Sequence, residues 1–317
     1  MPVTGRSRFD DPFCYGAKKY DSPGLLDTPQ KLALARFISS ALRGLRHSIG
    51  LSDRVRSRRR GICWDLDLAE GIDLSIYLLG AFEPRLVGAY RKLIRPGACI
   101  LDIGANIGAH TLQFAQLVGD RGKVVAYEPT AYAFAKLQTN LRLNPMLAQR
   151  VTTMQAMLVA SADQTLAGGV VSSWPLDARA RDGRHSLGAV RDTAGAVALT
   201  LDESLRRIGV SAVDFIKIDV DGNELGVLRG AESLMREQRP TLFLELAPYE
   251  YRNPGDFDAV LEILWQRDYG LRTGTGSAAL PRDARELRAR IPALGSINVI
   301  ASPSPAKPGS SGGMQAS

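Results

Sequence analysis

The 317-residue sequence is poor in the residues that build disulfide frameworks and metal centres. It has three cysteines, Cys14, Cys63 and Cys99, and their spacing matches no zinc motif. Because Cys99 lies in an apolar run, we expect reduced thiols, no structural metal and a cytoplasmic setting. No apolar run approaches the roughly 18 residues that a membrane span needs, and residues 1–30 lack the apolar core of a signal peptide. The sequence therefore predicts a globular protein without a membrane span.

Positive charge is concentrated at the start of the chain. Residues 1–60 hold 13 Lys and Arg against 5 Asp and Glu, whereas the remainder holds 27 against 28. We interpret residues 1–60 as a basic extension, with one helix indicated by the spacing of apolar residues between Leu32 and Leu45. The arginine-rich stretch 54–60 reads as a mobile arm, and contact with nucleic acid, anionic lipid or an acidic partner stays open.

Apolar runs and amphipathic stretches alternate after residue 61, which favours a parallel sheet covered by helices on both faces. We expect one globular domain over 61–301, an insertion at 163–200 that forms a hairpin or lid, and a disordered tail at 302–317. The pattern predicts a short strand at 64–68, a helical lead-in at 74–90, strands at 98–103, 123–127, 151–158, 213–219 and 240–246, and helices at 108–118, 130–143, 202–208, 223–237 and 256–267.

A glycine-containing loop follows the first strand of this series. Gly104 allows a sharp turn, and Gly108 allows close approach to the helix that follows. Glu128 ends the next strand, where a carboxylate can accept hydrogen bonds from ribose hydroxyls. This combination predicts a nucleotide-like ligand at the loop.

The loop differs from a dinucleotide site at its start. Asp102 occupies a position where a carboxylate would repel a pyrophosphate, and the spacing Asp102-x-Gly104-x-Asn106-x-Gly108 departs from GxGxxG. A carboxylate there suits S-adenosylmethionine, which carries an ammonium and a sulfonium group. The sequence therefore predicts a Rossmann-like class I methyltransferase, an α/β fold with a mostly parallel seven-stranded sheet, helices on both faces and an N-terminal helical extension.

Residues 62–250 resemble the FkbM family of methyltransferases. The shared motifs are YLLGAFE at 77–83, LDIGANIG at 101–108, Glu128-Pro129 and DFIKIDVDGNELGVLRG at 214–230, where Asp221 replaces the usual Glu. The resemblance implies O-methylation of a hydroxyl on a sugar, glycan or natural product. It also implies cofactor contacts from Glu83 and Ala156 in addition to Asp102, Gly104, Asn106, Gly108 and Glu128.

Acidic residues follow the later strands of the predicted sheet. Asp219 and Glu245 end two of these strands, and ligands of open parallel sheets bind beyond the carboxyl ends of strands. A hydroxyl acceptor must lose a proton, and Asp219, Glu245 and His185 are the candidate bases. The pair of acids would also suit a divalent cation, although no spacing establishes one, and Asp221 and Glu224 would complement a helix N-terminus.

Three alternatives remain at this level. A dehydrogenase would use the same topology, but Asp102 and the imperfect glycine pattern argue against it. A nucleic-acid methyltransferase could use the basic extension for phosphate contacts, although the Ala247-Pro248-Tyr249 segment follows the wrong strand for an amino-methylating motif. A non-catalytic binding module that retains the cofactor fold is the third.

Overall fold

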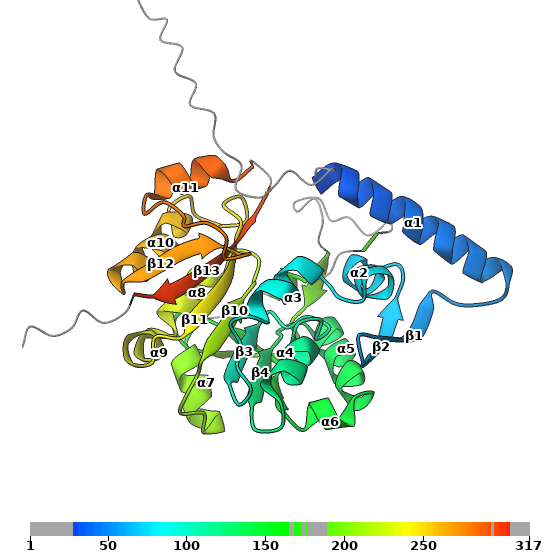
Figure 1. The fold of residues 1–317 in the computed structure, drawn as a ribbon, viewed down its shortest axis with the longest axis horizontal. Helices are drawn as coiled ribbons and strands as arrows, with labels where there is room; N and C mark the ends of the chain where they lie inside the picture. Colours follow the sequence, from blue (N-terminus) through cyan, green and yellow to red (C-terminus); the bar gives the residue numbers. More distant parts are fainter. Residues whose placement is uncertain (1–27, 165–167, 173–174, 177–188, 293–294, 305–317) are drawn as a thin grey trace, which may run out of the picture.

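A computed structural model describes residues 28–164, 168–172, 175–176, 189–292 and 295–304. Its centre is a seven-stranded sheet with one antiparallel strand (Figure 1). In spatial order its strands are β12 (Tyr269–Thr273), β13 (Ile297–Pro303), β11 (Thr241–Leu246), β10 (Phe215–Ile218), β3 (Cys99–Ile103), β4 (Lys123–Tyr127) and β5 (Val151–Met154). Only β13 runs against its neighbours in this sheet. The predicted mostly parallel seven-stranded sheet is confirmed.

Helices cover both faces of this sheet, because alternate side chains of its buried strands point to opposite sides. Ile100 belongs to one apolar cluster and Leu101 to the other. The first face is covered by α3 (Pro84–Tyr90) and α4 (Thr111–Val118). The second face is covered by α7 (Leu201–Ile208), α8 (Glu224–Arg229), α9 (Glu232–Glu237) and α10 (Asp256–Gln266).

Short polar sequences fix where several helices begin and end. Thr130 caps α5 (Ala131–Arg142), and Thr200 caps α7 by accepting a hydrogen bond from the Glu203 amide. Gly209 ends α7 with a φ of 68°, a left-handed conformation that glycine adopts without steric cost. Two further helices are α6 (Pro145–Ala148) and α11 (Ala284–Arg290).

The region before the sheet folds onto the body of the protein. It contains α1 (Thr28–Ser48), β1 (Arg54–Arg59), β2 (Ile62–Asp67) and α2 (Gly71–Leu79). β1 pairs with β2 along its whole length, so the arginine-rich stretch expected to be a mobile arm is an ordered strand from Arg54 onward. The hairpin also crosses the predicted boundary at residue 60, and Ile62 and Trp64 are fully buried in it.

Several boundaries differ from those expected. The predicted strand 151–158 divides at Gln155, because β6 (Ala156–Leu158) leaves the main sheet and pairs in parallel with β9 (Val197–Leu199). The predicted helix 223–237 divides near Gly230, where a Cβ would lie 2.3 Å from the Val159 carbonyl oxygen. The predicted helix 108–118 begins at Thr111, after a turn.

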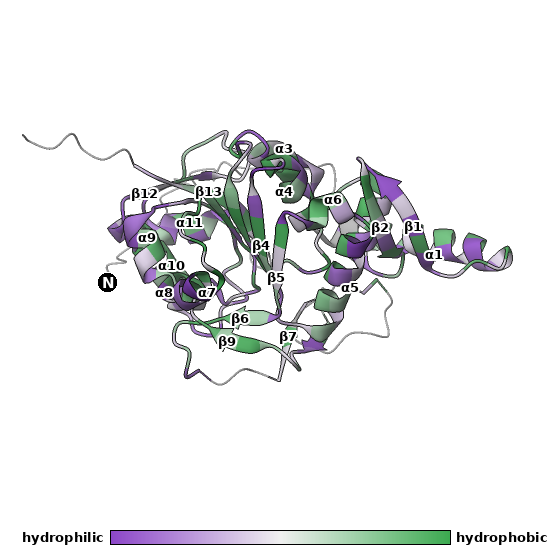
Figure 2. Ribbon diagram, turned by 90° about the horizontal axis from the view of Figure 1, so that it is seen from below, coloured by the Kyte–Doolittle hydropathy of each residue, from purple (hydrophilic) through white to green (hydrophobic). Residues whose placement is uncertain are grey.

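Parts of the predicted insertion and tail are also described. β7 (Gly169–Val171) and β8 (Val190–Asp192) pair antiparallel within the insertion. Figure 2 shows β6, β9 and β7 together below β4 and β5. Residues 302–303 belong to β13 rather than to a tail, whereas 305–317 and 1–27 lie outside the described residues. None of the helices in the described ranges combines the length and apolar composition needed to cross a membrane.

Candidate functional site

The strand register places the predicted site residues at one edge of the sheet. Ile103, the last residue of β3, pairs with Tyr127 on β4 and Ile218 on β10, and Ile218 pairs with Leu244 on β11. The residues that follow these strand ends therefore emerge side by side. They line a cavity of about 660 Å³. Of the predicted site residues, those on its wall are Glu83, Gly104, Asn106, Glu128, Ala156, Asp219 and Glu245.

Two glycines shape the loop after β3. Gly104 has a φ of 79°, and a Cβ there would lie 1.8 Å from the backbone oxygen of Asp219. Gly108 has a φ of 88° and faces Leu137, whose Cδ1 would be 2.7 Å from a Cβ. Any larger residue would force β3 and β10 apart or displace Leu137. Gly108 is not on the cavity wall, so it affects the site only through the shape of the loop.

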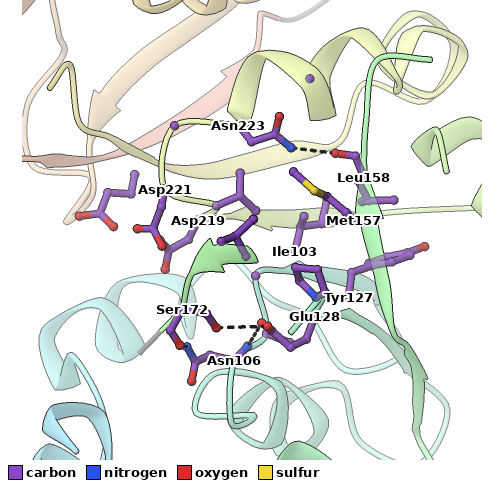
Figure 3. Close-up of a pocket in the computed structure, with 18 of the residues that line it drawn as sticks. Ile103, Asn106, Tyr127, Glu128, Met157, Leu158, Ser172, Asp219, Asp221 and Asn223 are labelled. Atoms are coloured by element: carbon purple, nitrogen blue, oxygen red, sulfur yellow. Dashed lines mark hydrogen bonds between the residues drawn. The ribbon is translucent and has the colours of Figure 1, made fainter. Parts of the chain in front are cut away.

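Glu128 is held in one position by several donors. One oxygen accepts hydrogen bonds from the amide and hydroxyl of Thr130, at 2.9 and 2.6 Å, and lies 3.3 Å from the Ser172 hydroxyl. The other accepts the amide of Asn106 at 2.9 Å. Burial raises the pKa of Glu128, although these hydrogen bonds favour the carboxylate. We call Asn106, Glu128, Thr130 and Ser172 the Glu128 end of the cavity (Figure 3).

Asn106 links this end to the insertion. It has a positive φ of 49°, unusual for a residue with a side chain, and its Oδ1 accepts the Ile107 amide. Its Nδ2 donates to the backbone oxygen of Ser172 at 2.7 Å. The segment after β7 therefore closes directly over Glu128, a contact that no sequence pattern indicated.

Asp102 lies behind the cavity wall rather than on it. Its side chain is fully buried, accepts a 2.6 Å hydrogen bond from Thr111 and lies 3.6 Å from Lys217 Nζ. Lys217 also contacts Asp219 at 3.1 Å and donates to the Gly104 carbonyl oxygen. Burial alone would lower the pKa of Lys217, but Asp219 and Asp102 outweigh it and raise that pKa. Asp102 therefore acts on the cavity indirectly, because it stabilises the charge of Lys217, which in turn contacts Asp219 on the cavity wall.

Asp219 and Glu245 form a carboxyl pair. Burial would raise the pKa of Asp219, but Lys217 and a hydrogen bond with Glu245 lower it. Burial, the charge of Asp219 and that of Glu83 raise the pKa of Glu245 well above its usual range. The Ser296 hydroxyl donates to Glu245 from the far side. Of the two carboxyls, Glu245 therefore holds a proton more tightly than Asp219 does.

His110 joins these acids, although its position in the helical pattern gave no sign of it. The side chain lines the cavity, is 6% exposed and has Nδ1 3.2 Å from the Tyr90 hydroxyl. Its Nε2 lies 3.8 Å from Glu83, the residue that precedes α3 with a φ of 45°. We call Glu83, His110, Lys217, Asp219 and Glu245 the Asp219 end. Lys217 was equally missed, because it alternates with apolar residues in a buried strand.

Two more acids line the cavity, and a third is buried next to it. Asp221 and Glu250 line it, and Asp221 has a positive φ of 47°. Glu224 lies in the first turn of α8, as predicted, and accepts the Gly222 amide at 3.3 Å. Burial raises the pKa of Glu224 to about 7. In the described part of the chain, no group of three or more His, Cys, Asp or Glu side chains is arranged to hold a metal ion.

An apolar wall completes the cavity on the side of β6. Ala156, Met157 and Leu158 line it, and Asn223 holds this strand by donating to the Leu158 carbonyl oxygen at 2.9 Å. This wall suits the flat face of an aromatic ring. His185, the third candidate base, lies outside the described residues.

The chain resembles known methyltransferases. The methyltransferase FkbM domain matches residues 102–271, just over half of the sequence. This protein belongs to the FkbM methyltransferase family. The predicted Rossmann-like class I fold is thereby confirmed, and the cofactor of this FkbM methyltransferase is S-adenosylmethionine.

Individual relatives are distant. The methyltransferase sdnD of Sordaria araneosa is 24% identical over 204 residues, which cover 52% of this chain and 76% of that protein. Methyltransferase FkbM from Methylobacillus flagellatus KT is 17% identical, with a TM-score of 0.40 over 87% of this chain and 71% of its own. A SAM-dependent O-methyltransferase from Thermotoga maritima is 14% identical, with a TM-score of 0.41 over 83% and 82%.

Proposed function

We propose that this FkbM methyltransferase methylates a hydroxyl group of a sugar, a glycan or a natural product. The observation that carries the proposal is the Asp219–Glu245 pair at the cavity wall. A hydroxyl acceptor has a proton to lose, and a carboxylate of raised pKa is a stronger base than an ordinary one. The cavity, at about 660 Å³, is within the range of small-molecule sites, which fits a cofactor and a compact acceptor group.

The residues of the cavity fit S-adenosylmethionine. The Glu128 oxygen that accepts the Asn106 amide has lone-pair capacity left for a ribose hydroxyl. Ala156 and its neighbours on β6 offer an apolar wall for adenine, and Gly104 keeps the loop close to the sheet. Glu83 provides a carboxylate for the ammonium group. Asp102 and Gly108 support this site from behind, through Lys217 and through Leu137.

The reaction needs alignment and a place for one proton. When bound, S-adenosylmethionine supplies a methyl group on a positively charged sulfur. Transfer of this methyl group to an acceptor oxygen, in line with the carbon–sulfur bond, leaves the sulfur neutral. The rigid strand ends hold the two reactants in position, an effect worth at most roughly 7–11 kcal/mol. Glu245, once ionised, takes the proton of the acceptor hydroxyl. Asp219, kept ionised by Lys217, strengthens Glu245 as a base by its negative charge.

Methyl transfer from radiolabelled S-adenosylmethionine to separated cellular fractions tests this proposal. Glycans, small metabolites and RNA are incubated separately with the protein, and the Glu245→Gln variant serves as the control. We expect label in the glycan or metabolite fraction, with greatly reduced incorporation by the variant. Label confined to RNA would contradict the proposal and support the alternative, an RNA methyltransferase whose exposed Arg54, Arg56 and Arg58 contact phosphates.

A further inference from the structure

The hairpin of β7 and β8 lies against the Glu128 end of the cavity. Its residues on the cavity wall, together with the residue that follows β7, are Gly169, Val170, Ser172 and Val190. The backbone oxygen of Ser172 accepts the Asn106 side chain at 2.7 Å, and the Ser172 hydroxyl lies 3.0 Å from the Thr130 hydroxyl. The hairpin therefore contacts the residues that hold Glu128 in position.

Arg191, in the middle of β8, attaches this hairpin to the body of the protein. It pairs with Val170 across the hairpin, so the strand register links it to the cavity wall. One guanidinium nitrogen lies 3.0 Å from a Glu70 oxygen, and the guanidinium carbon lies 4.1 Å from the centre of the Tyr132 ring. Both contacts are attractive, the first as a charge-assisted hydrogen bond and the second as a cation–π contact. We call Glu70, Tyr132 and Arg191 the Arg191 anchor.

The two partners of Arg191 come from different parts of the fold. Glu70 lies between β2 and α2, in the region before the sheet, whereas Tyr132 lies in the first turn of α5. Thr130, which caps α5, also donates to Glu128 through its amide and its hydroxyl. The start of α5 therefore contacts both the Arg191 anchor and the carboxylate at this end of the cavity.

The insertion makes a second attachment beside Glu70. Pro175 forms an isolated β-bridge with Glu70, and the Leu176 amide donates to the Ala69 carbonyl oxygen at 2.7 Å. Glu70 itself is 8% exposed. Burial raises the pKa of Glu70, whereas the charge of Arg191 favours its carboxylate form.

The hairpin depends on such contacts for its position. Each of its strands has three residues, and an isolated two-stranded hairpin is marginally stable at best in water. The side chains of Glu70 and Arg191 are 11% and 29% exposed, so water and salt screen this pair less than a fully exposed one. Loss of the pair should therefore loosen the hairpin before it affects the central sheet.

We propose that Arg191 is a positioning residue for cofactor binding, and that the Arg191 anchor sets how fast S-adenosylmethionine leaves the cavity. While the anchor is intact, Ser172 stays against Asn106 and Glu128. When the hairpin separates from Glu70, Ser172 moves away and the Glu128 end opens to solvent. The inference rests on the proposed cofactor contact of Glu128, and it does not depend on which acceptor is methylated.

The dissociation rate of the cofactor tests the proposal with the full-length protein. Radiolabelled S-adenosylmethionine is bound without any acceptor and is then chased with an excess of the unlabelled compound. We expect Arg191→Met to release the label at least about tenfold faster than the parent protein, because a charged hydrogen bond is lost. A dissociation rate reports on protein that still holds the label, so partial unfolding of the variant does not imitate this result. An unchanged rate would overturn the proposal.

Arg288→Met is the matched control. Arg288 lies 3.0 Å from Asp258 and 4.6 Å from the centre of the Phe257 ring, which repeats the two kinds of contact that Arg191 makes. Arg288 is not on the cavity wall. We expect Arg288→Met to release the label at the rate of the parent protein. Equal acceleration in the two variants would contradict a specific role of Arg191.

Two further variants test whether Arg191 acts through Glu70. Arg191→Lys keeps a cation for Glu70 but loses the planar group over Tyr132, and it should release the label at a rate between those of the parent protein and Arg191→Met. Glu70→Gln added to Arg191→Met should change the rate little, because the contact is already lost. A further large acceleration in this double variant would show that Glu70 acts without Arg191, which the proposal does not allow.

Hydrogen exchange provides a structural readout that is independent of the label. The Ser172 amide donates to the Ala189 carbonyl oxygen at 3.1 Å, next to the paired residues of β7 and β8. In Arg191→Met, amides of this hairpin should exchange faster, while those of β3 and β10 keep the protection of the parent protein. Faster release of the label without faster exchange in the hairpin would mean that the cofactor leaves by another route, and the proposal would fail.

Discussion

The two ends of the cavity differ in how their carboxylates are partnered. At the Glu128 end, both oxygens of Glu128 accept hydrogen bonds from neutral donors of the protein, and no cation of the described residues pairs with them. At the Asp219 end, Lys217 pairs with Asp219, Asp219 pairs with Glu245, and His110 Nε2 has no hydrogen-bond partner among the described residues. The first arrangement fixes a shape before any ligand binds. The second contains groups that can gain or lose a proton, as a reaction that removes a proton from its acceptor requires.

The carboxyl pair should therefore control rate rather than cofactor affinity. We expect Glu245→Gln to lower kcat by about 10²–10⁴-fold, because the amide cannot take a proton, with the Kd for S-adenosylmethionine nearly unchanged. Steady-state kinetics and calorimetry measure the two quantities. Glu250→Gln, at another carboxyl on the cavity wall, is the matched control. An equal fall in kcat in both variants would contradict a specific role of the Asp219–Glu245 pair in catalysis.

The same pair predicts a direction for the pH profile. Because the pKa of Glu245 is raised, the rate should increase as pH rises through that value and Glu245 ionises. Asp219→Asn removes a neighbouring charge that raises this pKa, so the rising limb should move to lower pH. An unmoved limb would mean that another group titrates.

Lys217 holds the Asp219 end together. Lys217→Met leaves Asp102 fully buried without a cation, and we expect the free energy of unfolding to fall by about 3–5 kcal/mol. Denaturant unfolding near neutral pH measures this. Adding Asp102→Asn should restore part of the loss, since it removes the uncompensated charge. A loss below about 1 kcal/mol, typical of a surface pair, would show that the lysine is dispensable.

Glu224, a buried acid in the first turn of α8, should make the stability of the protein depend on pH. Its carboxyl titrates near pH 7 in the folded protein and near 4.5 when unfolded, so the unfolded state loses its proton first as pH rises. Stability should fall across this window, by up to roughly 3 kcal/mol, and stay level above it. Glu224→Gln should make that slope shallower in thermal unfolding, whereas the exposed Glu232→Gln should leave it unchanged. A slope in Glu224→Gln equal to that of the parent protein would mean that Glu224 contributes nothing to it.

The smallest effect is expected at the Glu128 end. Glu128→Gln replaces one accepting oxygen by a donor that faces the Thr130 or Asn106 amide, and we expect the Kd for S-adenosylmethionine to rise about 10–100-fold. At saturating cofactor, kcat should stay close to that of the parent protein. A large fall in kcat with unchanged affinity would reverse the roles assigned to the two ends.

The sequence by itself determined the sheet, its loop and its cofactor class. Apolar runs bounded by glycine and acidic residues located the strands that became β3, β4, β10 and β11, because buried parallel strands need continuous apolar segments. The loop from Gly104 to Gly108 and Glu128 at the end of β4 followed from local backbone and strand-end rules. The motif at 214–230 indicated the FkbM family.

Only the tertiary structure decided which acids meet and which stay apart. Asp102 and Lys217 are separated by 115 residues, and strand pairing turns them into a buried ion pair behind the cavity instead of a ligand contact. His110 and Ser172 reach the cavity through contacts between distant segments, which local periodicity does not encode. Likewise, the helical pattern revealed α1, but only its packing through Ser39 and Leu42 settled which apolar side faces solvent.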